Sequence, residues 1–113
     1  MSNKKINLDS GATVEIQVAS FEKSHRLLQA VKASMIPMES LIDLIVSPTV
    51  QPSLWECLAC CLYNDQKIDR LTFDQEEARG DYLVVAKEAL VANLRPFFKS
   101  LASKSLDGLA EQK

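Results

Sequence analysis

The segment from Thr72 to Leu101 is the feature that most constrains how this chain can fold. It starts with acidic residues, passes Gly80 and Asp81, and continues as the long apolar run YLVVAKEALVANLRPFFKSL. As a helix, this run is apolar over more of its circumference than one small core can use. A helix that is apolar nearly all round is normally buried on all sides. In a chain of 113 residues, we expect the extra face to contact another polypeptide, which favours an interaction protein over an enzyme.

The apolar residues of this run form two stripes at helical spacing, separated by a narrow polar edge. We assign the first stripe to the core: Leu90, Leu94, Phe97 and Leu101. We assign the second stripe to an exposed partner-binding face: Tyr82, Val85, Ala89 and Phe98. The polar edge consists of Lys87, Glu88 and Asn93.

The first part of the chain has the period of a β-hairpin, from about residue 4 to residue 18. Ile6 and Leu8 alternate with polar residues, and so do Val14, Ile16 and Val18. Half-buried strands show this period of two. The sequence Asp9-Ser10-Gly11 between the two runs is typical of a turn.

From Ser20 onward the period becomes helical. Ser20 is a candidate N-cap, and the helix that follows carries an apolar stripe and ends before Pro37. That stripe consists of Phe21, Leu28, Val31 and Met35, widened by Leu27. Further helices are expected at residues 41–46, from Ser53 to Asn64, from Thr72 to Gly80, and from Asp81 onward, with a kink or a new segment at Pro96.

These expectations define the fold class as mainly α (α+β), with four to five helices and a short N-terminal β-hairpin. We expect residues 1–104 to form a single helical domain and residues 105–113 to form a flexible tail.

Composition and charge exclude several classes of partner. The net charge is −2 and the pI is about 5.4, so the chain lacks the basic face that nucleic acid requires. Residues 1–35 carry five basic and three acidic groups, whereas residues 65–81 carry six acidic and three basic groups; we interpret both as solvated faces. The apolar runs are too short to span a bilayer, and no signal peptide is recognisable. We therefore expect no membrane partner and a cytoplasmic location.

Candidate catalytic and metal-binding residues are few. Cys57, Cys60 and Cys61 have a spacing seen in redox and metal sites, but a closed zinc site needs four ligands and His25 is the only histidine. Mid-helix cysteines among leucines favour core packing. The acidic residues around Glu76 lack the spacing and glycine of a calcium loop. We expect no catalytic residue, no metal and no cofactor.

Three strings of this sequence are distinctive: INLDSGATVEIQV, SLWECLACCLYNDQKID and TFDQEEARGDYLVVAKEALVANLRPFFKSL. They resemble the tail assembly chaperones of long-tailed bacteriophages, particularly those that infect Gram-positive bacteria. The most specific parts are EEARGDY and NLRPFFKSL. The resemblance extends from about Lys4 to Leu101, over most of the chain.

The resemblance implies a function without catalysis in the cytoplasm of the bacterial host. Such chaperones coat the apolar tape measure protein, keep it soluble, and help recruit the tail tube protein during tail morphogenesis. The family is often made in two lengths through a ribosomal frameshift, and this chain would match the short form. Two alternatives remain: a self-assembling structural component of the tail or head-tail connector, which would form a homo-oligomer, and a small regulatory protein that binds a host factor.

Overall fold

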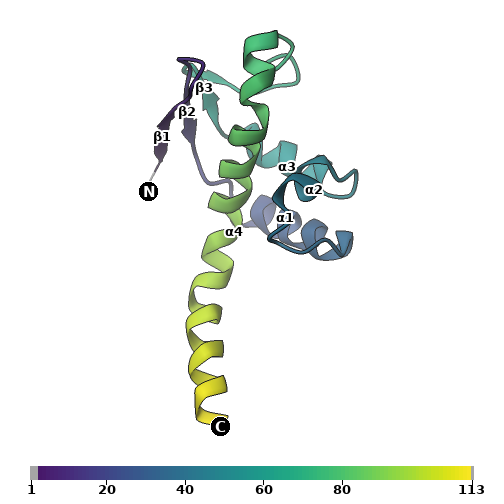
Figure 1. Ribbon diagram of the computed structural model, residues 1–113, viewed down its shortest axis with the longest axis vertical. Coiled ribbons are helices and arrows are strands. Elements are labelled where there is room, and N and C mark those ends of the chain that lie inside the picture. Colours follow the sequence, from purple (N-terminus) through teal and green to yellow (C-terminus); the bar gives the residue numbers. More distant parts are fainter. Residues whose placement is uncertain (1–2, 113) are drawn as a thin grey trace.

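The computed structural model describes residues 3–112, with side chains for residues 3–99. The described residues form four helices and one antiparallel sheet of four strands (Figure 1). This confirms the expected fold class, mainly α (α+β) with an N-terminal β-hairpin. The elements are β1 (Lys4–Asn7), β2 (Thr13–Ile16), α1 (Phe21–Ser34), α2 (Leu41–Val46), α3 (Gln51–Leu58), β3 (Leu62–Tyr63), β4 (Gln66–Lys67) and α4 (Glu76–Gln112).

The strands follow one another in the order β1-β2-β3-β4, and each pairs antiparallel with its neighbours. Gly11 closes the β1–β2 hairpin at a φ of 93°, a conformation that glycine adopts without steric cost. The second hairpin, β3–β4, was not expected from the sequence. Its two turn residues, Asn64 and Asp65, have φ values of 51° and 68°, as a type I′ turn requires. We had interpreted this pair only as the end of a helix.

The ends of the first three helices follow local sequence signals. Ser20 caps α1 as expected, since its Oγ accepts a hydrogen bond of 3.3 Å from the backbone N–H of Lys23. The helix ends at Ser34, and Met35 takes the left-handed conformation with a φ of 63°. The α3 helix starts at Gln51, ahead of the expected Ser53, because Pro52 fits the first turn of a helix.

The last helix, α4, corrects three expectations. It runs unbroken from Glu76 to Gln112, so Gly80 does not separate two helices and Asp81 does not cap one. It also continues through Pro96, so no new segment starts there, while the alternative of a kink at Pro96 stays a prediction. The backbone of residues 105–112 is helical; the flexibility expected of that tail stays a prediction, and Lys113 lies outside the described residues.

The carboxylate of Asp81 joins α4 to the sheet. It is only 7% exposed and accepts hydrogen bonds from Ser10 Oγ and from the Tyr63 hydroxyl, each 2.6 Å long. These bonds connect the turn of the first hairpin and strand β3 to the same point of α4.

The core surrounds the first half of α4, which contacts α1, α2, α3 and β2 (Figure 1). Fully buried side chains from these five elements meet there: Val14, Ile16, Leu27, Leu44, Ile45, Leu54, Leu58, Val85 and Leu90. Beyond this body the C-terminal part of α4 projects away from every other element (Figure 1).

Candidate partner-binding surface

The structure divides the two stripes of α4 differently from the sequence interpretation. Val85 and Ala89, assigned to an exposed face, are each 0% exposed, so that assignment is wrong. The physical reason is that α4 is enclosed by helices and by strand β2, so both stripes meet the core. Leu90 and Leu94 are buried as expected, while the side chain of Leu101 lies outside the described residues.

Asn93 also differs from its expected place on the polar edge of α4. It is 1% exposed, and its Oδ1 accepts hydrogen bonds of 2.8 Å from the Ala19 backbone N–H and from Ser24 Oγ. Its Nδ2 donates to the carbonyl oxygen of Ala89, also at 2.8 Å. A buried amide with all these partners connects α4 to the start of α1 and stabilises their relative position.

Tyr82 is half-buried in an aromatic cluster that the chain supplies itself. Its ring stacks on Trp55 at 6.0 Å between centroids and meets Phe73 edge-on at 5.1 Å. Its hydroxyl oxygen is 3.2 Å from Gln51 Nε2, which donates to it. Much of the contact surface of Tyr82 is therefore already used within the chain; partner binding by this residue stays a prediction.

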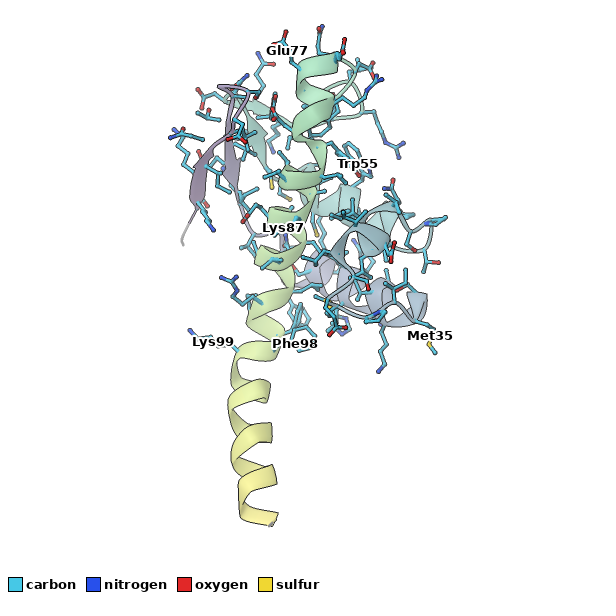
Figure 2. All side chains as sticks on the ribbon, viewed as in Figure 1. Met35, Trp55, Glu77, Lys87, Phe98 and Lys99 are labelled. Carbon is cyan, nitrogen blue, oxygen red and sulfur yellow. The ribbon has the colours of Figure 1, made fainter. Side chains whose placement is uncertain are left out.

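Phe98 is the one residue of the proposed partner-binding set that lies on an open apolar surface. It is 39% exposed and forms one wall of a groove between α4 and α1. We call this the α1–α4 groove and define it by its main lining residues: Leu28, Lys32, Met35, Ile36, Met38 and Phe98. Figure 2 shows Phe98 and Met35 on the same side of the molecule, at the lower end of its body.

The groove consists of two hollows that share Leu28, Lys32 and Phe98. Their volumes are about 390 Å³ and 490 Å³. Among the side chains that the structure describes, Lys32 is the only charged one that lines either of them. Two of the lining residues are methionines, whose flexible side chains adapt to surfaces of different shape.

The apolar surface continues along α1 toward its N-terminus. Phe21 is 73% exposed, and its ring stacks on His25 at 5.4 Å. Phe97, from α4, lies 5.8 Å from the Phe21 ring and 6.1 Å from the His25 ring. His25 thus serves as a partner of two aromatic rings, and Phe21, His25, Leu28 and Met35 follow one another at helical spacing.

Sequence reasoning missed this surface because it treated the apolar residues of α1 as one stripe. In the structure, Leu27 and Val31 are buried, whereas Phe21 and Met35 are 73% and 88% exposed. The signal was present in the sequence, since Phe21, Leu28 and Met35 are spaced by seven residues and Leu27 and Val31 by four. Leu27 and Leu28, as neighbours in sequence, point in different directions from α1, and Met35 lies just beyond the helix, which ends at Ser34.

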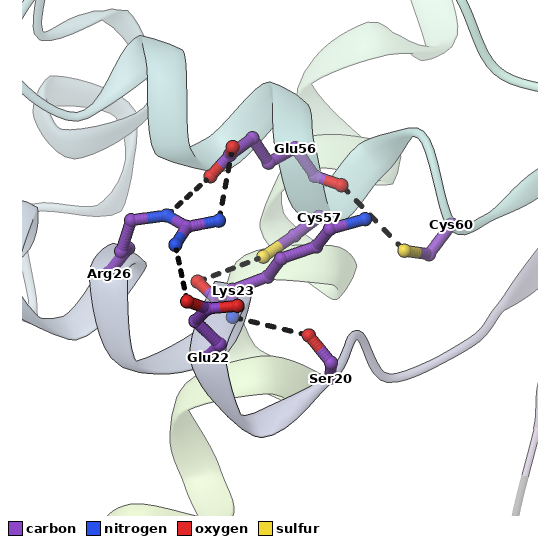
Figure 3. A network of polar contacts seen from close by, with 7 residues as sticks. All are labelled: Ser20, Glu22, Lys23, Arg26, Glu56, Cys57 and Cys60. Carbon is purple, nitrogen blue, oxygen red and sulfur yellow. Dashed lines mark hydrogen bonds and ion pairs between the residues drawn. The ribbon is translucent and has the colours of Figure 1, made fainter.

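A network of ion pairs covers a neighbouring face of α1 (Figure 3). Arg26 contacts Glu56 of α3 at 3.1 Å and Glu22 of its own helix at 3.5 Å. The hydrogen bond to Glu56 is the main cause that raises the pKa of the Arg26 guanidinium. This network connects α1 to α3, and none of its three residues lines the groove.

The cysteines pack in or against the core as expected, but only Cys57 lies in a helix, because α3 ends at Leu58 and not at Asn64. Cys57 and Cys61 are 0% exposed, and Cys60 is partly exposed. Figure 3 shows the thiols of Cys57 and Cys60 directed at carbonyl oxygens of Lys23 and Glu56. Burial raises the pKa of Cys57 to about 12 and also raises that of Cys61, which disfavours the thiolate needed for redox chemistry.

Within the described residues, no group of three or more His, Cys, Asp or Glu side chains is placed to hold a metal ion. Nor does any helix in that part of the chain have the length and apolar character to cross a membrane.

Comparisons of this chain with models of protein families, with curated proteins and with solved structures gave no match.

Proposed function

We propose that this protein is a tail assembly chaperone of a long-tailed bacteriophage. In this proposal it acts without catalysis in the cytoplasm of the bacterial host, where it binds the tape measure protein, keeps it soluble and helps recruit the tail tube protein. The observation that carries the proposal is the α1–α4 groove, an open apolar surface with one charged lining residue. The resemblance of the sequence to this family supplies the identity of the partner.

The groove suits a helical partner for two reasons. Its residues come from α1, from the loop that follows α1 and from α4, and an apolar groove accepts an amphipathic helix through apolar anchors spaced by three and four residues. Exposed apolar patches on small proteins usually mark interaction sites. Here Met35 and Phe98 line the groove, and the exposed Phe21 contacts Phe97, the neighbour of Phe98 in the sequence.

The methionines of the groove favour binding to partner segments that differ in sequence. Met35 and Met38 line the groove, and flexible methionine side chains repack around unlike sequences better than branched ones do. A chaperone that coats a long apolar protein must bind along much of its length without one strict motif. The groove composition supports this mode of binding.

The experiment is co-expression of this protein with helical segments of the tape measure protein, which is expected in a very long reading frame just downstream. The wild-type chain should keep the segments soluble and bind them in purified form. Phe98→Ala should weaken binding by roughly 2 kcal/mol or more, since large aromatics dominate such interfaces. Its melting temperature should change little, because Phe98 is partly exposed.

Two variants serve as controls. Leu83→Ala removes an apolar side chain of the same helix that is 42% exposed and lies outside the groove, so binding should be unchanged. Leu90→Ala removes a fully buried side chain and should lower stability by about 2–5 kcal/mol. Segments that precipitate equally with and without the wild-type chain would contradict the proposed function.

The alternative is a self-assembling structural component of the tail or head-tail connector. The observation that favours it is the C-terminal part of α4, whose backbone projects from the body (Figure 1). The same experiment separates the two functions, because a structural component should self-associate and ignore tape measure segments.

A further inference from the structure

A separate pocket lies where α3, the segment between β4 and α4, and the start of α4 meet. Its volume is about 380 Å³, and none of its lining residues lines the α1–α4 groove. We call it the Trp55 pocket and define it by Trp55, Arg70, Arg79 and Tyr82. Figure 2 shows Trp55 above Phe98 in the view, toward the end of the body that Glu77 marks.

Two arginine side chains line this pocket, and neither forms an ion pair with a described side chain. The Arg70 guanidinium lies over the Trp55 ring, with its central carbon 5.6 Å from the ring centroid. Arg79 donates from Nε to the Phe73 carbonyl oxygen at 3.3 Å and from Nη2 to that of Asp74 at 3.1 Å. These contacts orient both guanidinium groups and leave Arg79 Nη1 and the N–H groups of Arg70 for a ligand.

The Tyr82 hydroxyl is a third donor at the pocket. Among the described residues its hydrogen bond comes from Gln51 Nε2, at 3.2 Å, and Gln51 also lines the pocket. Gln51 Nε2 donates to the Ile45 carbonyl oxygen at 2.6 Å as well, which fixes the donor end of this amide. The Tyr82 oxygen is thus the acceptor in its bond with Gln51, and its own hydrogen is left for another acceptor.

These donors suit an anionic group, and the surrounding charge selects which kind. Guanidinium groups bind carboxylate and phosphate through parallel hydrogen bonds. Residues 65–81 carry six acidic and three basic groups, and Asp74 itself lines the pocket. A phosphate group with nearly two negative charges is therefore repelled more strongly than a carboxylate with one.

We propose that the Trp55 pocket binds a carboxylate of a partner protein. Arg70 and Arg79 pair with the carboxylate oxygens, and the Tyr82 hydroxyl donates to the same group. The rings of Trp55 and Phe73 contact the carbon atoms that carry the carboxylate. The carboxylate belongs either to an Asp or Glu side chain or to a chain end. This inference does not depend on the tape measure protein or on the α1–α4 groove.

Trp55 is the only tryptophan of the chain, so its fluorescence reports directly on this pocket. The test is titration of the full-length protein with acetyl-Leu-Glu-Leu-amide, with acetyl-Leu-Gln-Leu-amide, and with acetyl-Leu-Ala-Leu that ends in a free carboxylate. The glutamate peptide should bind with a dissociation constant of about 1 mM or below. The glutamine peptide should bind at least about tenfold more weakly, because it lacks the charge. Whichever of the two carboxylate peptides binds more tightly identifies the source of the carboxylate.

Two variants remove one donor each. Arg70→Gln, at an exposed residue, and Tyr82→Phe, which keeps the ring, should each raise the dissociation constant of the glutamate peptide by about fivefold or more. Arg95→Gln is the matched control, because it removes an exposed arginine of α4 that does not line the pocket; binding should be unchanged. Circular dichroism shows whether each variant is folded.

Four results would overturn the inference: no binding of either carboxylate peptide, equal binding of the glutamate and glutamine peptides, an unchanged dissociation constant in both donor variants, or tighter binding of inorganic phosphate than of the glutamate peptide. Phe98→Ala, which alters the groove, should leave binding of the glutamate peptide unchanged. A protein that binds this peptide and no tape measure segment would contradict only the proposed function. The reverse result would contradict only the carboxylate site.

Discussion

At the scale of single residues, burial determines how reactive the three cysteines are. Cys57 and Cys61 are fully buried and have raised pKa values, whereas Cys60 is partly exposed. We expect a thiol reagent to modify Cys60 first in the folded protein and all three only after denaturation, as mass spectrometry of the digested protein would show. Replacing Cys60 and Cys61 by alanine should leave partner binding unchanged. Stoichiometric zinc in protein purified without added metal would contradict this account.

Burial of Tyr63, together with its hydrogen bond to Asp81, makes the stability of the protein depend on pH in the alkaline range. The pKa of Tyr63 is raised from an ordinary value of about 10 to about 12. Burial is the main cause, and the hydrogen bond to the Asp81 carboxylate is the second. The unfolded chain therefore loses this proton first as pH rises. The contribution of Tyr63 to the free energy of unfolding is therefore fully present below about pH 10, and it is lost as the pH rises to about 12.

We expect Tyr63→Phe to be less stable than the wild type at neutral pH, by about 0.5–1.5 kcal/mol or more, because the buried Asp81 carboxylate loses one donor. Between about pH 10 and pH 12 the stability of the variant should fall less steeply than that of the wild type. Urea unfolding at a series of pH values would measure both effects. Parallel pH profiles for the two proteins would show that Tyr63 does not contribute.

At the scale of elements, Gly80 tests whether α4 is one helix. A Cβ atom built on Gly80 meets no heavy atom within 4 Å, and the backbone there is helical. Gly80→Ala should therefore stabilise the protein by about 0.8–1 kcal/mol through helix propensity alone. Chemical denaturation of the two proteins would measure the difference. A loss of stability would instead support the helix break at Gly80 that the sequence indicated.

The sequence indicated most helices and the first hairpin because these depend on local signals. The change of period at Ser20, the Ser20 cap and the turn at Gly11 each act within a few residues. The β3–β4 hairpin was predictable in principle, since Asn64 and Asp65 both tolerate the left-handed conformation, but its two-residue strands are too short to show alternation.

The binding surface was harder to predict because it depends on packing between distant elements. Val85 and Ala89 are buried only because α4 has neighbours on several sides. Asn93 looks like a surface residue in the sequence, and its burial depends on hydrogen bonds to Ala19 and Ser24. These neighbours decide which apolar stripe of α4 stays exposed to solvent. Of the four residues assigned to partner binding, only Phe98 lies on an open apolar surface.

At the scale of the whole molecule, charge and apolar surface are separated along α4. The acidic start of the helix, marked by Glu77, lies at the opposite end of the body from Phe98 (Figure 2). The ion pairs among the described side chains are Lys4–Glu88, Arg26–Glu22 and Arg26–Glu56. None of them joins the basic residues 1–35 to the acidic residues 65–81, in agreement with two solvated faces.

This separation predicts the thermodynamic signature of partner binding. Because the groove has one charged lining residue, Lys32, binding of a tape measure segment should bury apolar surface and form few ion pairs. Isothermal titration calorimetry at several temperatures should therefore give a negative heat-capacity change, which is the reliable sign of apolar burial. Affinity should change little from low to high salt, since salt screens charges and leaves apolar contacts intact.

Phe98→Ala should make the heat-capacity change less negative, whereas Leu83→Ala, outside the groove, should leave it unchanged. A steep loss of affinity with salt, or a heat-capacity change near zero, would place the contact on the charged faces and away from the α1–α4 groove.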